Sequence, residues 1–259
     1  MDIEKALKLA KELAIQAGEK ILEIYNTDFA VEYKSDASPL TLADTRSNEI
    51  IVNALANKFP EVAILTEEAK DDKSRLGNDW CFIIDPLDGT KEFIKRNGEF
   101  TVNIALAHEH KPVMGVIYVP ALDELYYAAE NQGAFFMKNH SEPRKITVSK
   151  RADNLRLVKS RSHPSKQLEE LIAKNADRIS EQKVAGSSLK GCLIAKGEAE
   201  IYYRFGHTME WDTCAMHCIV EQAGGIFRQL DDSPLLYNRE IPLNEKGFYV
   251  LNNEKSKLH

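Results

Sequence analysis

Residues 85–90 read Asp-Pro-Leu-Asp-Gly-Thr, and this stretch says most about the fold and the chemistry of the chain. It follows Trp80-Cys81-Phe82-Ile83-Ile84, a short apolar run that predicts a buried strand. The proline and the glycine predict a turn directly after that strand. Asp85 and Asp88 around a tight turn suit a hard cation such as Mg²⁺, which takes oxygen ligands and keeps room for water and phosphate. An ordinary turn is the alternative that these six residues leave open.

Three further acidic positions lie at predicted element boundaries. Glu67-Glu68 follow residues 62–66, a second apolar run that is typical of a strand. Asp44 lies at the start of a helical stretch, and Asp212 stands directly before an apolar helix that runs to about Ala223. Asp44 and Asp212 also favour helix N-termini electrostatically, so each position alone has a structural explanation. Acidic residues at four boundaries, beside Pro, Gly or Trp, favour a shared metal site.

With these residues the sequence resembles the Mg²⁺-dependent, lithium-sensitive phosphatase superfamily of inositol monophosphatase and fructose-1,6-bisphosphatase. Four segments are similar to its 3′(2′),5′-bisphosphate nucleotidase branch, the CysQ type: residues 91–103, 160–163, 186–190 and 203–206. The resemblance covers about residues 9–250. Asp-Pro-Leu-Asp-Gly-Thr specifies the superfamily, whereas Gly-Ser-Ser-Leu-Lys at 186–190 and Arg-Phe-Gly at 204–206 indicate the branch.

The resemblance implies an α/β fold, a layered α/β/α/β/α sandwich with the active site in a cleft between two halves. The N-terminal α+β half, residues 1–150, would carry most metal ligands, and the C-terminal α/β half, residues 151–259, the nucleotide-binding residues. The sequence pattern agrees, with helical spacing at 3–25 and 42–58, an antiparallel meander over 101–137 and alternating strands and helices after 150. Those later strands are predicted at 155–159, 181–184 and 199–203, and the helices at 165–174 and 188–196. The polar stretch 35–39 predicts a loop, which the resemblance implies is mobile near the metals.

The resemblance also implies two or three Mg²⁺ ions, which can together activate the phosphate, the water and the leaving group. Asp85 would be shared between two metals, with Glu67 and the Leu87 carbonyl completing the first site and Asp88 and Asp212 binding the second. Glu68 is left open as a further ligand. Asp44 and Thr90 would orient and deprotonate the attacking water, because a threonine hydroxyl is a weak base without a carboxylate partner.

The substrate is implied to contact residues on both sides of the cleft. Ser187 and Ser188 follow Gly186 at a predicted helix start, where an anion binds well, and Lys190 and Arg204 add cationic donors that suit a 5′-phosphate. Either serine could be only a helix cap, both cations could be surface charges, and Trp211 is expected to pack between the halves. The full implied set is Glu67, Leu87, Asp88, Gly89, Thr90, His163, Ser187, Ser188, Lys190, Arg204 and Asp212.

Composition narrows the class of protein. The net charge of −6 over 259 residues argues against a nucleic-acid polymer as partner, but local cations and metals still allow a small anion. The cysteines lie in apolar segments, which fits free thiols in a reducing compartment, and no second ligand pair with zinc-finger spacing supports zinc at Cys214, His217 and Cys218. Because no signal peptide or membrane span is evident, we expect a cytoplasmic enzyme. As a separate expectation, a monomer is favoured over an oligomer. Peripheral contact with the inner membrane stays open.

The sequence therefore predicts a Mg²⁺-dependent phosphatase that removes the 3′-phosphate of 3′-phosphoadenosine 5′-phosphate to give AMP. We expect it also to act on 3′-phosphoadenosine 5′-phosphosulfate, in connection with sulfate assimilation. Inositol monophosphatase activity is the nearest alternative, and the positive charges at Lys190 and Arg204 argue against it. A regulator that binds the nucleotide without turnover is the other, and the Asp44–Thr90 pair argues against that.

Overall fold

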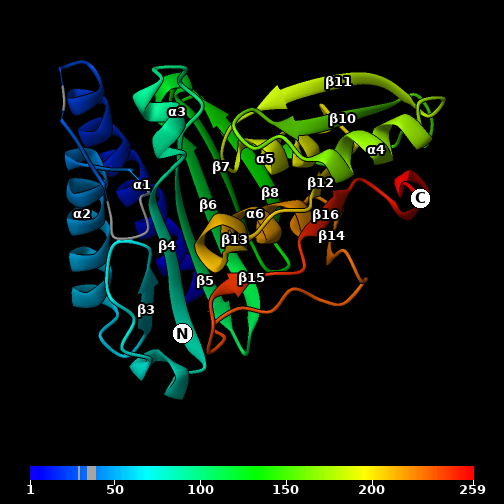
Figure 1. The fold of residues 1–259 in the computed structure, drawn as a ribbon. Helices are drawn as coiled ribbons and strands as arrows, with labels where there is room; N and C mark the ends of the chain where they lie inside the picture. Colours follow the sequence, from blue (N-terminus) through cyan, green and yellow to red (C-terminus); the bar gives the residue numbers. More distant parts are fainter. Residues whose placement is uncertain (29, 34–38) are drawn as a thin grey trace.

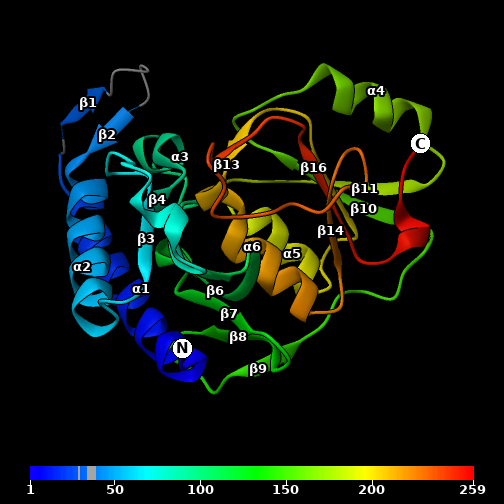
Figure 2. The ribbon, with the colours of Figure 1, turned by 90° about the horizontal axis from the view of Figure 1, so that it is seen from below.

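The computed structural model describes residues 1–28, 30–33 and 39–259, and its helices and sheets stack in alternating layers (Figure 1). The helices α1 (Ile3–Tyr25) and α2 (Leu42–Lys58) form one outer layer. A large sheet, the helices α5 (Leu189–Ala195) and α6 (Glu210–Gln222), a second sheet and the helix α4 (Lys166–Lys174) follow in that order. Figure 2 shows the same succession from below. The predicted α/β/α/β/α sandwich is confirmed.

The large sheet has seven strands in sequential order, from β3 to β9. The first two strands run parallel and every later pair antiparallel, so the meander predicted over residues 101–137 is confirmed. The strands are β3 (Ala63–Thr66), β4 (Trp80–Asp88), β5 (Thr101–His108), β6 (Lys111–Val119), β7 (Glu124–Ala129), β8 (Gly133–Lys138) and β9 (Arg144–Ile146).

The second sheet has five strands in the order β11-β10-β12-β16-β14. β10 runs parallel to both of its neighbours, and β16 runs antiparallel to β12 and β14. The strands are β10 (Leu155–Ser160), β11 (Ile179–Ala185), β12 (Ile201–Arg204), β14 (Ile226–Gln229) and β16 (Phe248–Leu251). The strands and helices predicted between residues 155 and 204 are therefore present, within a few residues of their expected bounds.

Smaller elements complete the chain. The helix α3 (Thr90–Ile94) follows β4, and two short antiparallel pairs join β1 (Val31–Tyr33) to β2 (Pro39–Thr41) and β13 (Thr208–Met209) to β15 (Leu243–Asn244). The 3₁₀ turns are Ser74–Gly77, Pro120–Leu122 and Glu254–Ser256. Of the loop predicted at 35–39, residues 35–38 lie outside the described residues. Among the helices described, none combines the length and the apolar character that a membrane crossing requires.

The spaces between the layers are filled by three hydrophobic clusters, and alternate residues of one strand enter different clusters. In β4, Phe82 and Ile84 pack with the outer helices, whereas Cys81 and Ile83 pack with α6. This period of two is what a strand buried on both faces produces. At Gly115 of β6 an added Cβ would lie 2.4 Å from the Ala215 carbonyl oxygen, so a glycine is required where α6 crosses the sheet.

The middle cluster, which lies between the two sheets and includes α5 and α6, contains residues from both sides of residue 150. Ile83 and Ile117 of the first sheet share it with Val158 and Phe248 of the second, through the helices between them. The two halves are thus joined by a common core, and the division at residue 150 stays a prediction about how the chain is organised.

The turn predicted at Pro86 is wrong, because β4 continues through Asp88. Asp85 pairs with Asn103 and Asp88 with Thr101, so two residues of β4 bulge out opposite one residue of β5. Pro86 is tolerated there because a bulge residue has no ladder hydrogen bond to donate. The chain turns at Gly89 instead, where φ is +91° and α3 begins. The two carboxylates therefore flank a strand bulge and do not lie beyond a strand end.

Candidate active site

A cavity of about 590 Å³ opens between the large sheet and the second half of the chain. Its walls come from the ends of β3 and β4, from α3, from the start of α5, from β12 and from the first turn of α6. Most of the predicted site residues line it: Glu67, Asp85, Leu87, Asp88, Gly89, Thr90, His163, Ser187, Lys190, Arg204 and Asp212. Asp44 and Ser188 are buried behind this lining and reach it through hydrogen bonds.

Three carboxylates lie close together in the cavity. Oxygen atoms of Asp85, Asp88 and Asp212 all lie within 4.8 Å of one another. Burial, followed by the neighbouring Glu67 and Asp88 carboxylates, raises the pKa of Asp85 well above its usual range. Burial and then Asp88 raise the pKa of Asp212 to about 8. Asp85 is buried and Asp88 and Asp212 are partly buried. Carboxylates of like charge at this spacing fit a divalent cation, which prefers oxygen ligands and relieves their repulsion.

Asp88 is held in one orientation by donors from both halves. Its Oδ2 accepts hydrogen bonds from the Ser188 backbone N–H at 2.7 Å and the Ser188 hydroxyl at 2.9 Å. Asn103 and Thr101 of β5 donate to the same oxygen at 3.3 and 3.4 Å. Because these bonds all reach Oδ2, the carboxylate is turned so that Oδ1 is the oxygen it offers to a cation.

Asp44 connects the start of α2 to Thr90. Its Oδ2 accepts from the Thr41 backbone N–H at 2.8 Å and from the Thr41 hydroxyl at 2.7 Å, which caps the helix. The Thr90 hydroxyl lies 3.3 Å from the other oxygen, Oδ1. The structural and the functional explanations of Asp44 are thus compatible, because one oxygen caps the helix and the other contacts a cavity residue.

Asp212 occupies the same position in its own helix. The sequence predicted Asp212 directly before the helix. This position is wrong, because α6 begins at Glu210 and Asp212 lies within its first turn. Its Oδ2 accepts the Met209 backbone N–H at 2.6 Å. A capping carboxylate is favoured at this position by the free N–H groups and the helix dipole.

The backbone around Leu87 is fixed from several sides. The Leu87 N–H donates to Asp85 Oδ1 at 3.1 Å, and the Thr90 hydroxyl lies 3.5 Å from the Leu87 carbonyl oxygen. At Gly89 an added Cβ would lie 2.5 Å from the Ser187 hydroxyl, so the two halves of the chain approach closely there. Glu67 follows β3, and its N–H donates to the Ile84 carbonyl at 3.3 Å, which places it beside β4. Glu68 is partly buried and is not among the described residues that line the cavity.

Two cations, Lys190 and Arg204, also line the cavity. Lys190 is 7% exposed, its ammonium group donates to the Ser187 carbonyl at 2.5 Å, and burial lowers its pKa. Arg204 donates from Nη2 to the His207 carbonyl at 3.1 Å. Within the described part of the chain, Arg204 Nε is the buried side-chain donor that lacks a hydrogen-bond partner. A buried donor without a partner is costly, so this nitrogen is suited to receive an anionic ligand.

A second cavity of about 420 Å³ adjoins the first beside Arg204. It shares Ser160, His163 and Arg204 with the first cavity and extends between residues 164–168 and 203–206. Burial, then the charges of Arg204 and Lys91, lower the pKa of His163 to about 4, so the imidazole is neutral near pH 7. The two cavities together can enclose a ligand larger than a single phosphate ester.

The segment that carries His163 is fastened to the N-terminal half. The Arg161 guanidinium makes two hydrogen bonds of 2.6 Å to the Glu99 carboxylate, and the Ser162 hydroxyl donates to Glu92. These contacts explain why residues 91–103 and 160–163, predicted to mark the same branch, lie together.

Sequence reasoning missed several lining residues. Lys91 and Glu92 directly follow the hexapeptide and His207 directly follows the Arg-Phe-Gly segment, so their position beside those motifs was the available signal. Tyr202, Met216 and Phe248 also line the cavity, but an apolar residue in a strand or helix carries no sequence signal that separates cavity lining from core. Trp211 packs against the middle cluster and also lines the cavity.

Comparisons with known proteins identify the family of this chain. The profile of the inositol monophosphatase family matches residues 2–256. The 3′(2′),5′-bisphosphate nucleotidase CysQ of Salmonella typhimurium is 40% identical over 92% of this chain and 96% of its own length, and that of Escherichia coli K12 is 38% identical over the same shares. The crystal structure of CysQ from Bacteroides thetaiotaomicron has a TM-score of 0.82 and 43% identity, and covers 93% of this chain and 95% of its own. An inositol monophosphatase of Thermotoga maritima has a TM-score of 0.81 and 25% identity, and covers 96% and 92%.

Proposed function

The chain belongs to the inositol monophosphatase family, and from that premise we propose that it is a Mg²⁺-dependent 3′(2′),5′-bisphosphate nucleotidase. It would hydrolyse the 3′-phosphate of 3′-phosphoadenosine 5′-phosphate and release AMP. Curated relatives named as this enzyme, at 38–40% identity over more than nine tenths of the chain, support the proposal.

One observation carries the substrate class: a single cavity is lined by a carboxylate cluster and by two cations. Asp85, Asp88 and Asp212 form the cluster, and the cations are Lys190, which is buried, and Arg204, which is partly buried. A bisphosphate has two anionic groups, so one phosphate can be cleaved at the carboxylates while the other is held by the cations. The adjoining cavity beside His163 has room for the base and ribose.

The metal ligands follow from the same cluster. Glu67, Asp85, Asp88, Asp212 and the Leu87 carbonyl would hold two or three Mg²⁺ ions between them. Bound there, Mg²⁺ would polarise the phosphoryl oxygens, lower the pKa of a bound water and neutralise the leaving oxygen. The fixed orientation of Asp88 by Ser188 supports this set, because preorganised ligands bind metal more tightly than mobile ones.

Thr90 and Asp44 are the proposed water-activating pair. The Thr90 hydroxyl would orient the attacking water, and Asp44 Oδ1, 3.3 Å from that hydroxyl, would receive the proton through it. Asp44 is 1% exposed, and Thr41 holds its second oxygen, so Oδ1 is kept directed at Thr90. General-base assistance of this kind is worth about 10²–10⁴-fold in rate.

We extend the proposal in three respects. The enzyme would also accept 3′-phosphoadenosine 5′-phosphosulfate, whose 5′ group is likewise anionic, and so would serve sulfate assimilation. It would be inhibited by lithium, since a monovalent ion in a Mg²⁺ site supplies less charge stabilisation. It would act as a monomer in the cytoplasm.

Inositol monophosphatase activity is the alternative, since solved structures of that name share this fold. The unpartnered Nε of Arg204 and the buried Lys190 favour a substrate with a second anionic group. Inositol 1-phosphate would leave the Nε of Arg204 without a partner.

The test is phosphate release from 3′-phosphoadenosine 5′-phosphate, inositol 1-phosphate and fructose 1,6-bisphosphate, with Mg²⁺ and with or without lithium. We expect the nucleotide to have the highest kcat/KM, and Asp85→Asn to abolish release while the circular dichroism spectrum stays unchanged. Phosphate release by Asp85→Asn equal to that of the parent at saturating Mg²⁺ would contradict the metal assignment. A higher kcat/KM for inositol 1-phosphate than for the nucleotide would mean that inositol 1-phosphate is the substrate.

A further inference from the structure

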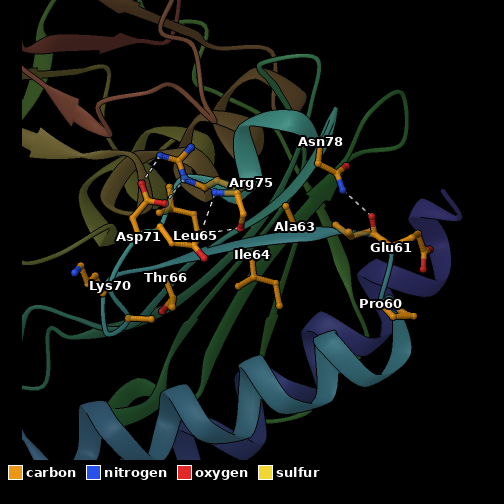
Figure 3. Close-up of a pocket in the computed structure, with 14 residues that line it drawn as sticks. Pro60, Glu61, Ala63, Ile64, Leu65, Thr66, Lys70, Asp71, Arg75 and Asn78 are labelled. Atoms are coloured by element: carbon orange, nitrogen blue, oxygen red, sulfur yellow. Dashed lines mark hydrogen bonds and ion pairs between the residues drawn. The ribbon is translucent and has the colours of Figure 1, made fainter.

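A largely buried network of polar residues joins the loop after Glu67 to the start of α6. Asp71 and Arg75 belong to that loop, Asn238 and Arg239 to the segment before β15, and Glu210 to the first turn of α6. None of these side chains lines the active-site cavity described above. Figure 3 shows Asp71 and Arg75 bonded to each other beside β3, at a separate small pocket.

Arg75 is the centre of this network and is only 3% exposed. Its Nε and Nη2 donate to the Asp71 carboxylate at 3.1 and 2.8 Å, within its own loop. Its Nη1 donates to Asn238 Oδ1 at 2.8 Å, and Nη2 also reaches the Arg239 carbonyl at 2.8 Å. One planar guanidinium therefore fixes two loops that are 163 residues apart in sequence.

Glu210 extends the network into α6. Its side chain is fully buried, and its Oε2 accepts the Asn238 N–H at 2.6 Å. Its Oε1 accepts the backbone N–H and the Nε of Arg239, both at 3.0 Å. The first residue of α6 is thus anchored to the segment that Arg75 holds, two positions before Asp212.

Asn244 closes the network around the helix start. Arg239 Nη2 donates to its Oδ1 at 2.5 Å, and its Nδ2 donates to the Met209 carbonyl at 3.0 Å and the Thr213 hydroxyl at 3.2 Å. Met209 is the residue whose N–H holds Asp212 Oδ2. The same network therefore contacts residues on both sides of Asp212, the backbone of Met209 and the side chain of Thr213.

Stability alone explains this network poorly. Burying charged groups costs free energy that their attraction repays only in part, and apolar residues of similar volume often stabilise a core as well or better. A fork of directed hydrogen bonds does what apolar packing cannot, because it sets distance and orientation between the segments it joins.

We propose that Arg75 and Glu210 are positioning residues that set the spacing between Glu67 and Asp212, and so the affinity of the site for divalent metal. The inference rests on the proposed function, since it takes those carboxylates as metal ligands. Glu67 directly follows β3, whereas Asp212 lies in α6. Arg75, in the 3₁₀ turn eight residues after Glu67, bonds Asn238, and the Asn238 N–H bonds Glu210 at the start of α6.

The experiment measures binding of Mn²⁺ to the whole protein by electron paramagnetic resonance, together with the melting temperature of the metal-free form. The variants are Glu210→Gln, which keeps the shape and removes the charge, and Arg75→Lys, which keeps the charge and loses the fork. The matched controls are Glu200→Gln and Arg156→Lys. Glu200 is also fully buried and pairs with Arg156 at 2.5 Å, and neither residue lines the active-site cavity.

We expect both test variants to raise the Kd for Mn²⁺ about 10–100-fold, the usual cost of losing a partner that orients metal ligands. The Mg²⁺ concentration for half-maximal activity should rise by a similar factor, while kcat at saturating Mg²⁺ stays close to that of the parent. The controls should lower the melting temperature and leave the Kd for Mn²⁺ unchanged.

Test variants that lose melting temperature as the controls do, with an unchanged Kd for Mn²⁺, would overturn the inference. If Glu210→Gln does not fold, Arg75→Lys decides by the same comparison. Failure of the parent protein to bind Mn²⁺ would instead overturn the proposed function itself, so the two failures are distinguishable.

Discussion

The Ser188 hydroxyl donates a hydrogen bond of 2.9 Å to Asp88 Oδ2, and this bond joins residues 100 positions apart at the carboxylate cluster. The Ser188 backbone N–H reaches the same oxygen at 2.7 Å, and the hydroxyl lies 3.1 Å from the Asp212 carbonyl oxygen. Ser188 is 2% exposed. The structure thus gives it contacts with a carboxylate of the cluster, whereas its direct contact with a substrate stays a prediction.

Ser188→Ala should therefore weaken divalent metal binding. We expect a Kd for Mn²⁺ about 10–100-fold higher than in the parent, because Asp88 loses a donor that fixes its orientation. Ser180→Ala is the control for the loss of a serine hydroxyl, since Ser180 of β11 bonds the Asn154 carbonyl and does not line the cavity. Equal Mn²⁺ affinity in Ser188→Ala and Ser180→Ala would exclude this role for Ser188.

Thr90→Ala should lower kcat and leave KM for 3′-phosphoadenosine 5′-phosphate nearly unchanged. The expected loss is about 10²–10⁴-fold, because Asp44 then has no hydroxyl through which to receive the proton of the attacking water. Thr90→Ser keeps the hydroxyl and should recover most of the rate. A kcat of Thr90→Ala near that of the parent would take Thr90 out of the mechanism.

The stability of the metal-free protein should fall as the pH rises from about 4 to about 8. Burial and the Asp88 charge raise the pKa of Asp212 to about 8, whereas an unfolded aspartate has a pKa of about 3.9. Between these values the folded state binds more protons than the unfolded state, so the free energy of unfolding decreases with pH.

The check is urea unfolding in a chelator at about pH 5 and about pH 8, for the parent and for Asp212→Asn. The parent should lose more unfolding free energy between these values than Asp212→Asn, whose amide does not titrate. Saturating Mg²⁺ should reduce the loss in the parent. If the free energy of unfolding changes with pH by the same amount in both proteins, the pKa of Asp212 is not raised in the folded state.

Much of the fold was readable in the sequence where one element forms its own pattern. The helices at 3–25 and 42–58 have the predicted bounds because one apolar stripe runs along each of them. β14 and β16 were not predicted, although they occupy one side of the second sheet. Each has four residues, which is too short to show a clear period.

The candidate site was predictable as a set of residues but not as a network. Residues 85–90 were placed on a turn because proline and glycine favour one, whereas pairing with β5 keeps Asp88 in the strand. The partners that orient the carboxylates, such as Ser188 for Asp88 and Glu210 beside Asp212, act through contacts between distant segments. Such contacts depend on how the layers stack, and no spacing along the chain encodes them.

The central claim is that one cavity cleaves one phosphate at the carboxylates and holds a second at the cations, and Arg204→Ala tests it most directly. A charge-assisted hydrogen bond is worth about 1.5–3 kcal/mol, or about 10–150-fold in binding. KM for 3′-phosphoadenosine 5′-phosphate should rise by about that factor, while KM for adenosine 3′-monophosphate, which lacks the 5′-phosphate, should scarcely change. Equal impairment of both substrates, or of neither, would contradict the account.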